Sequence, residues 1–299
     1  MPRSLLSKRQ KRELKKVQLQ SVNPRPARNG RESIYMTPHT YRGLAVVAFI
    51  DLLGFSRRIT AEWNVEDGPL EKLIALKGKI REGSAPPAVT MVFYNDDPEA
   101  GTGFGTPRVT SVSDSIMIAS PVFRPDDSRF LYGPLANVLG RAWAAMHFAA
   151  ELGYAVRGAV EIGEIYWDVN EIIGPAFNAV YSLESKVAKS ARVIYGPNLI
   201  WELALDIEAG RAEMPAQILG MSYKCEDGLY ALKPDPRCID AMEELRSQAP
   251  EPLKAKYDET IRVGREPENF AAEPPPIEEF KLALERLKER MEAAMSGRI

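Results

Sequence analysis

The 299-residue chain contains 45% apolar residues and has a formal net charge of −2, from 39 basic and 41 acidic residues. A chain of this size can bury a substantial core, and its balanced charge gives no general attraction for nucleic acid, so direct nucleic-acid binding is not expected. The longest apolar run, from Gly43 to Ile50, is far shorter than the roughly 20 residues that span a bilayer, which argues against membrane insertion. Two cysteines without C-x-x-C spacing predict neither a zinc site nor a disulfide framework.

Residues 1–42 are expected to form a basic, flexible arm. Their basic cluster is followed by a stretch that is rich in proline and poor in apolar spacing. Glu13 interrupts the cluster, and no apolar segment with a small-residue cleavage site follows it. The arm therefore does not resemble a secretory signal, and we expect a cytoplasmic protein.

The first half of the chain alternates apolar strands with amphipathic helices. A near-continuous apolar strand is predicted over 44–50, covered on both faces, and a helix over 70–80 that stops at the breakers of 83–87. A strand near 89–94 and a polar loop over 95–105 follow. Residues 108–118 have the pattern of two short strands joined by a tight turn that contains Asp114.

The alternation continues to residue 197. Helical spacing predicts a long helix over 132–152 that Gly153 closes, and the next residues, 154–163 and 164–168, are typical of a pair of strands. Gly174 and Pro175 open a further helix, and 192–195 is predicted as a last short strand. This order of elements is that of an α/β (α+β) sandwich of the ferredoxin-like type with extensions.

We expect three parts in the chain, the arm at 1–42, a catalytic domain at 43–197 and an extension at 198–299. The extension is rich in proline and ends in a predicted helix from about Ile277 to Met295. That helix has charges of alternating sign on one face and an apolar stripe on the other, so we expect it to pack against another surface.

Two aspartates occupy positions that suit a divalent cation. Asp51 ends the first apolar strand and is followed by Gly54, while Asp114 lies in the turn of the hairpin. In a ferredoxin-like sheet the end of the first strand lies beside that turn, so the two carboxylates are expected to meet. Two bare carboxylates would repel each other, which implies a cation between them, and hard oxygen ligands favour Mg²⁺ or Mn²⁺ over zinc.

Four segments together resemble the class III adenylyl and guanylyl cyclase family. They are FIDLLGFS at 49–56, SDS at 113–115, VRGAVEIG at 156–163 and IGPAFNAVYSLES at 173–185, and they occur in the family's order and spacing. The resemblance covers about residues 43–197. It implies a class III cyclase catalytic domain with two metal ions in each active site, and active sites that form across a head-to-tail homodimer.

The resemblance also implies roles for individual residues. Asp51 and Asp114 match the family's metal-binding aspartates, and Leu52 matches the position whose backbone carbonyl joins a metal. The segment from Phe49 to Phe55 matches the loop that contacts the phosphates. Asn178 matches the asparagine that positions the ribose.

The departures from the family concern the base and the transition state. The family's purine-reading lysine falls on Thr110 and its acidic partner on Glu171, so neither the adenylyl nor the guanylyl pair is present. The family's transition-state arginine falls on Ser182, which leaves that role to another cation. The candidates are Lys186 and Arg192 first, with Lys189 and Arg108 behind them.

A short cyclase with this degenerate base code resembles the bacterial pyrimidine cyclases of the Pycsar anti-phage systems. That resemblance implies conversion of UTP to 3′,5′-cyclic UMP and pyrophosphate, and a product that activates a separately encoded effector. CTP or ATP as substrate remains an alternative, as does a catalytically silent homologue that binds nucleotide. The sequence leaves open the base, the activating trigger and the effector.

Simpler roles remain open for several of these residues. Asp51 can cap the following helix and Asp114 can serve as an ordinary turn former. Asn178 can be a surface or packing amide, and Arg157, within an apolar strand, can make a structural ion pair instead of touching phosphate. His147 has no ligand partner along the sequence and is expected to be non-catalytic, and the same holds for His39 in the arm.

Overall fold

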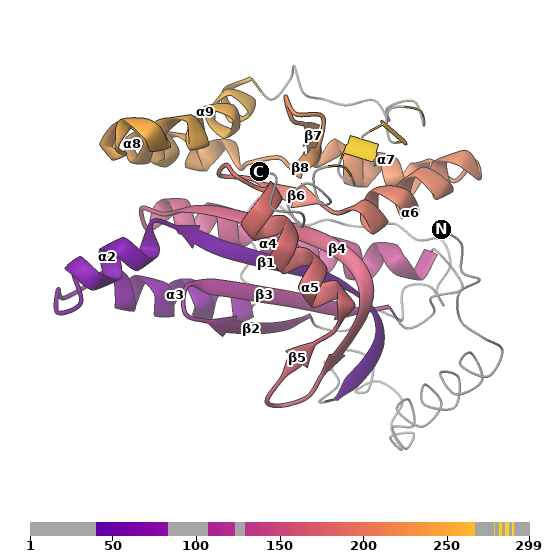
Figure 1. Ribbon diagram of the computed structural model, residues 1–299, viewed down its shortest axis with the longest axis horizontal. Coiled ribbons are helices and arrows are strands. Elements are labelled where there is room, and N and C mark those ends of the chain that lie inside the picture. The colour runs from indigo at the N-terminus through magenta and orange to yellow at the C-terminus, as the bar shows by residue number, and fades with distance from the viewer. Residues whose placement is uncertain are drawn as a thin grey trace.

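The computed structural model describes residues 40–82, 107–122 and 129–266, together with a few positions between Glu278 and Glu289. The described chain folds around an eight-stranded sheet with the strand order β2-β3-β1-β4-β6-β8-β7, in which β5 pairs with β4 beside this path. Helices cover the sheet, and the β4–β5 hairpin projects from it as a curled ribbon (Figure 1). None of the helices in these described ranges is both long enough and apolar enough to cross a lipid bilayer.

The first six main elements are β1 (Tyr41–Leu53), α2 (Phe55–Ala61), α3 (Pro69–Glu82), β2 (Arg108–Val112), β3 (Ser115–Pro121) and α4 (Arg129–Glu151). They are followed by β4 (Ala155–Trp167), β5 (Ile172–Ile173), α5 (Pro175–Ser182), the π-helical segment η2 (Leu183–Val187), β6 (Val193–Tyr195) and α6 (Pro197–Glu208). The last described elements are α7 (Glu213–Gly220), β7 (Ser222–Lys224), β8 (Tyr230–Leu232), the 3₁₀ turn η3 (Pro236–Cys238), α8 (Ile239–Gln248) and α9 (Glu251–Arg265).

The connectivity from β1 to β4 is ferredoxin-like, as the sequence predicts. β1 lies in the middle of the sheet and runs antiparallel to both β3 and β4, and β2 is added outside β3. The helical crossovers between β1 and β2 and between β3 and β4 complete a strand-helix-strand-strand-helix-strand unit. The predicted mixed α/β fold is therefore confirmed.

Side chains on the two faces of β1 enter two different cores, which explains its near-continuous apolar sequence. Val46, Ala48 and Ile50 belong to a core with residues of α3, α4 and α6. Val47 and Phe49 point to the other face, where they pack with residues of α5 and η2. A strand that is buried on both faces does not alternate between apolar and polar residues, because neither face meets water.

The predicted pair of strands at 154–163 and 164–168 is wrong, because these residues form the single strand β4 of 13 residues. The predicted boundary between the two strands is Gly163, but this residue lies within β4 and pairs with Ala45 of β1. A Cβ atom at Gly163 would lie 3.2 Å from the Cβ of Ala176, so this glycine lets α5 pack closely on the sheet. The short partner strand is β5, which follows β4.

The strand at 193–195 is not the last one, because β7 and β8 follow it and extend the same sheet. Ile194 of β6 pairs with Ala231 of β8, and β8 pairs antiparallel with β7. The sheet thus includes residues that the sequence assigns to the extension. α8 and α9 pack against each other near this end of the molecule (Figure 1).

Several predictions fall outside the described residues. They are nearly all of the basic arm, the strand near 89–94 and the whole of the loop over 95–105. The predicted final helix lies mostly outside them as well. The few positions that are described there are helical, and Lys281 forms an ion pair of 3.2 Å with Glu278.

Candidate functional site

Asp51 lies near the end of β1, between β3 and β4. Its register partner on β4 is Arg157, and a guanidinium nitrogen of that residue is 3.5 Å from a carboxylate oxygen of Asp51. On the other side Ser115, the first residue of β3, donates its hydroxyl to Asp51 over 3.1 Å. The sheet therefore fixes the Asp51 carboxylate between a hydroxyl and a cation.

Asp114 lies in the turn between β2 and β3, directly before Ser115. The preceding residue, Ser113, has a positive φ of 53°, which tightens the turn. Ser56 in the first turn of α2 donates its hydroxyl to Asp114 over 3.4 Å. Lys77 of α3 donates its ammonium to the carbonyl oxygen of Ser113, so two helices hold this turn next to the end of β1.

Asp114 lies close to Asp51, because the next residue, Ser115, is hydrogen-bonded to Asp51. The pKa of Asp51 is raised, first by burial and then by the negative charge of Asp114, while the hydroxyl of Ser115 and the guanidinium of Arg157 act in the opposite direction. A divalent cation would relieve this destabilisation of the charged form of Asp51. The sequence-based expectation that these remote residues interact at one sheet edge agrees with this coupling.

A third carboxylate, that of Glu184, lies on the other side of Arg157 from Asp51 and is buried. Arg157 is 2.5 Å from Glu184, so its guanidinium bridges Glu184 and Asp51. The pKa of Glu184 is raised first by burial, with Arg157 lowering it and Asp51 and Asp114 raising it further. The centre therefore contains three acidic side chains and one guanidinium.

Glu184 reaches this place because the helix that begins at Pro175 widens into the π-helical segment η2. The N–H of Ala188 donates to the carbonyl of Leu183 over 2.8 Å, the hydrogen bond that spans the wider turn. η2 packs against β1 and β4, and the Glu184 side chain is buried there. π-helical turns occur frequently at functional sites.

Sequence reasoning missed Glu184 and Lys77 and left Arg157 undecided. Lys77 lies close enough to Asp114 for that carboxylate to raise its pKa, against a larger lowering by burial. In the sequence, Glu184 and Arg157 stand inside two of the four segments that carry the family resemblance. A charged residue of each sign, one within an apolar strand and one within an apolar helix face, is the sequence signal that could have predicted this buried ion pair.

The segment 49–55 is not the loop that the family resemblance predicts. β1 continues to Leu53, Gly54 has a φ of 80°, and α2 starts at Phe55. The side chain of Leu52 is buried in the core on the α4 face, so only its backbone could take part in a site. Phe55 is also buried and packs on Tyr154 with 5.7 Å between ring centroids, so its side chain is structural and not a substrate contact.

Phe49 and Thr110 lie on the Asp51 side of the sheet. Side chains alternate along a strand, so Phe49 and Asp51 share a face. Thr110 is paired with Met117, and Met117 is paired with Phe49, which places all three in one row beside the Asp51 row. Phe49 also contacts the rings of Phe177 and Tyr181 edge-on, at 6.1 and 5.6 Å between centroids.

Glu171 is not brought to Asp51 within one chain, and no contact with Asp51 is recorded for the described side chain of Asn178. Glu171 lies in the turn after β4, at the end of this strand opposite to Arg157, where its N–H donates to Asp168. The pKa of Asp168 in this turn is lowered first by the backbone N–H groups of Asn170 and Glu171. The positive charge of Arg108 lowers it further, so Arg108 lies near the same turn. Asn178 is exposed on α5.

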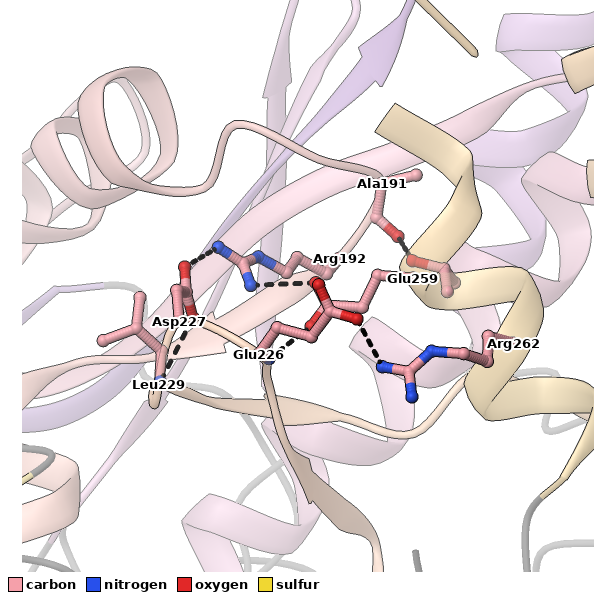
Figure 2. A network of polar contacts seen from close by, with 8 residues as sticks. Ala191, Arg192, Glu226, Asp227, Leu229, Glu259 and Arg262 are labelled. Carbon is pink, nitrogen blue, oxygen red and sulfur yellow. Dashed lines mark hydrogen bonds and ion pairs between the residues drawn. The ribbon is translucent and has the colours of Figure 1, made fainter. Parts of the chain in front are cut away.

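The two leading cation candidates have different surroundings. Lys186 is exposed on η2, two residues after Glu184. Arg192 is only 5% exposed and is held between Asp227, at 2.5 Å, and Glu259 of α9, at 3.0 Å (Figure 2). Arg192 therefore joins β6 to the β7–β8 turn and α9, and its predicted catalytic role has no support in this geometry.

No protein-family model matches the chain, and no curated protein matches it in sequence. Solved structures show a distant similarity to class III adenylyl and guanylyl cyclase domains. The adenylyl cyclase CyaB from P. aeruginosa is 13% identical, with 55% of this chain and 82% of that chain covered and a TM-score of 0.38. A class III adenylyl cyclase-like ATP-binding protein from Pseudomonas aeruginosa is also 13% identical, with 68% and 46% covered and a TM-score of 0.39.

The monomeric guanylyl cyclase domain of the RhoGC fusion protein from the aquatic fungus Blastocladiella emersonii is again 13% identical. The match covers 64% of this chain and 95% of that domain, with a TM-score of 0.35. These scores are too low to assign a function, which has to be argued from the site itself.

The residues at the end of β1 fit a hard divalent cation. Asp51 and Asp114 supply carboxylate oxygens, whose mutual repulsion a cation would offset, and the Leu52 carbonyl is adjacent in the chain. Among the residues that the structure describes, no three His, Cys, Asp or Glu side chains are arranged to hold a metal ion. The protein ligands would therefore be two carboxylates and backbone oxygen, and Glu184 remains the partner of Arg157.

Proposed function

We propose that this protein is a nucleotide cyclase of the class III type that converts UTP into 3′,5′-cyclic UMP and pyrophosphate. The observation that carries the proposal is the placement of Asp51 and Asp114 at one edge of a ferredoxin-like sheet, where Ser115, the residue after Asp114, donates its hydroxyl to Asp51. Phosphoryl transfer requires little covalent chemistry from a protein, since positioning and charge stabilisation supply most of the rate. Two carboxylates held on a rigid sheet are suited to that task.

In this proposal Asp51, Asp114 and the Leu52 carbonyl hold two Mn²⁺ or Mg²⁺ ions. When bound, these ions would lower the pKa of the ribose 3′-hydroxyl and neutralise the triphosphate as pyrophosphate leaves. Ser115 and Ser56 keep the two carboxylates in place through their hydroxyl hydrogen bonds. Arg157 and Lys77 supply positive charge beside the aspartates, where the phosphates would lie.

The preference for a pyrimidine rests on what is missing from the base-reading positions. Thr110 lies in the row of side chains next to Asp51 and offers a short hydroxyl in place of a long cation. Phe49 in the same row offers an aromatic surface that the rings of α5 extend. A short polar side chain beside an aromatic surface suits a small base, and CTP is the closest alternative to UTP.

The active site is proposed to form between two copies of the chain. Glu171 lies at the far end of β4 from Asp51 and Asn178 is exposed on α5, so both would complete the site of a second copy. Exposed apolar side chains around them support such a contact, with 69% exposure for Val169 and 52% for both Ile173 and Tyr181. Lys186, exposed on the same helical segment, is the remaining predicted cation that would act at this interface.

A catalytically silent, nucleotide-binding protein is the second candidate. It is favoured by the ion pair between Asp51 and Arg157, which occupies part of the carboxylate that a cation would need. It is also favoured by Ser182 at the position where the family has an arginine. Binding of UTP without release of pyrophosphate would establish this alternative.

The experiment that tests the proposal is incubation of the purified protein with an equimolar mixture of ATP, GTP, CTP and UTP and Mn²⁺, followed by mass analysis of the products. We expect cyclic UMP and pyrophosphate as the main products. Asp51→Asn and Asp114→Asn should each lower turnover by about 100-fold or more, because an electrostatic element of the site is lost. Glu208→Gln, on an exposed position of α6, is the matched control and should leave turnover unchanged.

A cyclase that makes a diffusible nucleotide acts through another protein. We propose that the product is a second messenger for a separately encoded effector in defence against phage, and that the enzyme works in the cytoplasm. Absence of any cyclic nucleotide from all four triphosphates would overturn this role together with the enzymatic activity.

A further inference from the structure

The centre around Asp51 and Asp114 contains a further carboxylate to which the proposed reaction gives no task, that of Glu184. Its side chain is only 4% exposed, compared with 22% for Asp51, and it lies within the electrostatic neighbourhood of both aspartates. A carboxylate buried to this extent is costly unless a cation compensates it. The compensating cation is Arg157.

One guanidinium nitrogen of Arg157 contacts two carboxylates. This nitrogen is 2.5 Å from Glu184 and 3.5 Å from Asp51, so the closer and better shielded partner is Glu184. Attraction between charges grows as water is excluded, and the Glu184 side is the drier one. The position of the guanidinium therefore depends on how strongly Glu184 holds it.

The same geometry connects Glu184 to the metal affinity of Asp51. An arginine that moved fully onto Asp51 would compete with a cation for its oxygen atoms. Glu184 itself is not part of a three-ligand metal site within the described chain, and it forms an ion pair of 2.5 Å with the guanidinium of Arg157. An effect of Glu184 on metal binding would thus pass through Arg157.

We propose that Glu184 is a positioning residue, which draws the guanidinium of Arg157 toward itself, limits its contact with Asp51 to 3.5 Å and so keeps the Asp51 carboxylate available for a divalent cation. This inference rests on the proposed function, because it assumes that Asp51 binds metal. The π-helical turn η2 is what aims Glu184 at β4, so the wider turn has a defined task in the site.

The test is the binding of Mn²⁺ to the full chain without nucleotide, measured by the loss of the free-ion signal in electron paramagnetic resonance. Glu184→Gln frees Arg157 to pair with Asp51 and should weaken Mn²⁺ binding about tenfold, as expected for an added buried ion pair. Glu184→Asp keeps the charge and should restore most of the affinity. Glu208→Gln should bind Mn²⁺ like the unmodified protein.

A double-mutant cycle with Arg157→Gln separates the proposed route from a direct effect. Without the arginine there is no cation to redirect, so Glu184→Gln should then change Mn²⁺ affinity by about twofold or less. An equally large loss in both backgrounds would overturn the proposal, because Glu184 would then act on the metal directly. Thermal unfolding of each variant checks that it is folded, and Glu184→Ala, which also removes the charge, takes the place of Glu184→Gln in the cycle if that variant does not fold.

The same measurement distinguishes failure of this inference from failure of the proposed function. If Asp51→Asn and Asp114→Asn leave Mn²⁺ binding unchanged, the metal site itself is wrong. If both abolish binding while Glu184→Gln has no effect, only the positioning role is wrong.

Discussion

The hydroxyl oxygen of Ser115 lies 3.1 Å from a carboxylate oxygen of Asp51, at the point where β3 begins beside the end of β1. Among the described residues, Ser115 is the one whose hydroxyl donates to the Asp51 carboxylate. Ser115→Ala removes this hydrogen bond and leaves the ion pair with Arg157. We expect Mn²⁺ affinity to fall about three- to tenfold, the size of one hydrogen bond to a charged group. Titration with Mn²⁺ measures it.

The control for this change is Ser111→Ala. Ser111 is paired with Ile116, which belongs to the core on the α4 face, so its side chain points away from Asp51. It should bind Mn²⁺ like the unmodified protein. Equal affinities for all three proteins would mean that the Ser115 hydroxyl does not orient Asp51.

A second prediction concerns the buried hydrogen bond between Tyr132 of α4 and Asp206 of α6. The tyrosine hydroxyl donates to the carboxylate over 2.7 Å, and Asp206 is buried. Tyr132→Phe should lower the free energy of unfolding by about 1 to 3 kcal/mol, because a buried charged group loses a partner. Urea denaturation measures the change.

The matched substitution is Tyr166→Phe, which removes a similar hydrogen bond of 3.0 Å to Asp168 at the rim of the molecule. Water can replace that bond, so the expected change is within about 0.5 kcal/mol. Similar losses for both variants would show that burial does not decide the strength of these two contacts.

A third prediction is a pH dependence of stability that comes from Glu161. Burial raises the pKa of this carboxyl from 4.5 to about 7, although the backbone N–H groups of Ile162, Asn198 and Leu199 act against this increase. The folded state then holds a proton that the unfolded state releases. The resulting stability is fully present below pH 4.5 and is lost as the pH rises to about 7.

The loss should reach about 3 kcal/mol at most, since a tenfold change in proton affinity corresponds to about 1.4 kcal/mol. Glu161→Gln carries no charge at any pH, so the free energy of unfolding of this variant should lack this component. The measurement is urea unfolding of both proteins at pH 5 and pH 8. A constant difference between them at the two pH values would contradict the assignment to Glu161.

A fourth prediction separates a structural from a catalytic role for Arg192. Glu259→Gln removes one of its two carboxylate partners and should lower the free energy of unfolding by about 2 kcal/mol, because the pair is largely buried. Asp258→Asn, one residue earlier in α9, affects an exposed pair with Arg246 and should cost less than about 1 kcal/mol. Thermal unfolding compares them.

Turnover per folded molecule completes the fourth test. It should stay within about twofold of the unmodified protein in Glu259→Gln, because additivity holds for distant, independent sites. A large loss of turnover in protein that remains folded would instead connect Arg192 with catalysis.

The sequence predicts the ferredoxin-like unit well because its elements are long and periodic. The apolar run before Asp51, the hairpin around Asp114 and the long helix closed by Gly153 all appear where their patterns place them. The strands β7 and β8 could not be predicted in the same way, since three residues are too few for a period and their partner β6 lies far along the chain. Pairing, not local preference, makes them strands.

The candidate site can be predicted in part for a similar reason. Asp51 and Asp114 stand in recognisable segments, so their meeting follows from topology. The partnership of Arg157 with Glu184 depends on a π-helical turn, and no spacing rule for α-helices or strands predicts where such a turn points its side chains. The sequence misplaces Arg192 because its partners, Asp227 and Glu259, come from the part of the chain in which no site is expected.

The contact between α9 and the peptide of Ala191 has a practical consequence for shortened proteins. The backbone carbonyl of Lys256 in α9 accepts the Ala191 N–H over 2.8 Å, and the Thr260 hydroxyl donates to the Ala191 carbonyl over 2.6 Å. A protein that ends before this helix would lose both of these hydrogen bonds to Ala191 and the Glu259 partner of Arg192, and Asp227 would remain as the other carboxylate partner of that guanidinium. Loss of activity in such a shortened protein would then reflect impaired folding. It would not show that α9 regulates the activity.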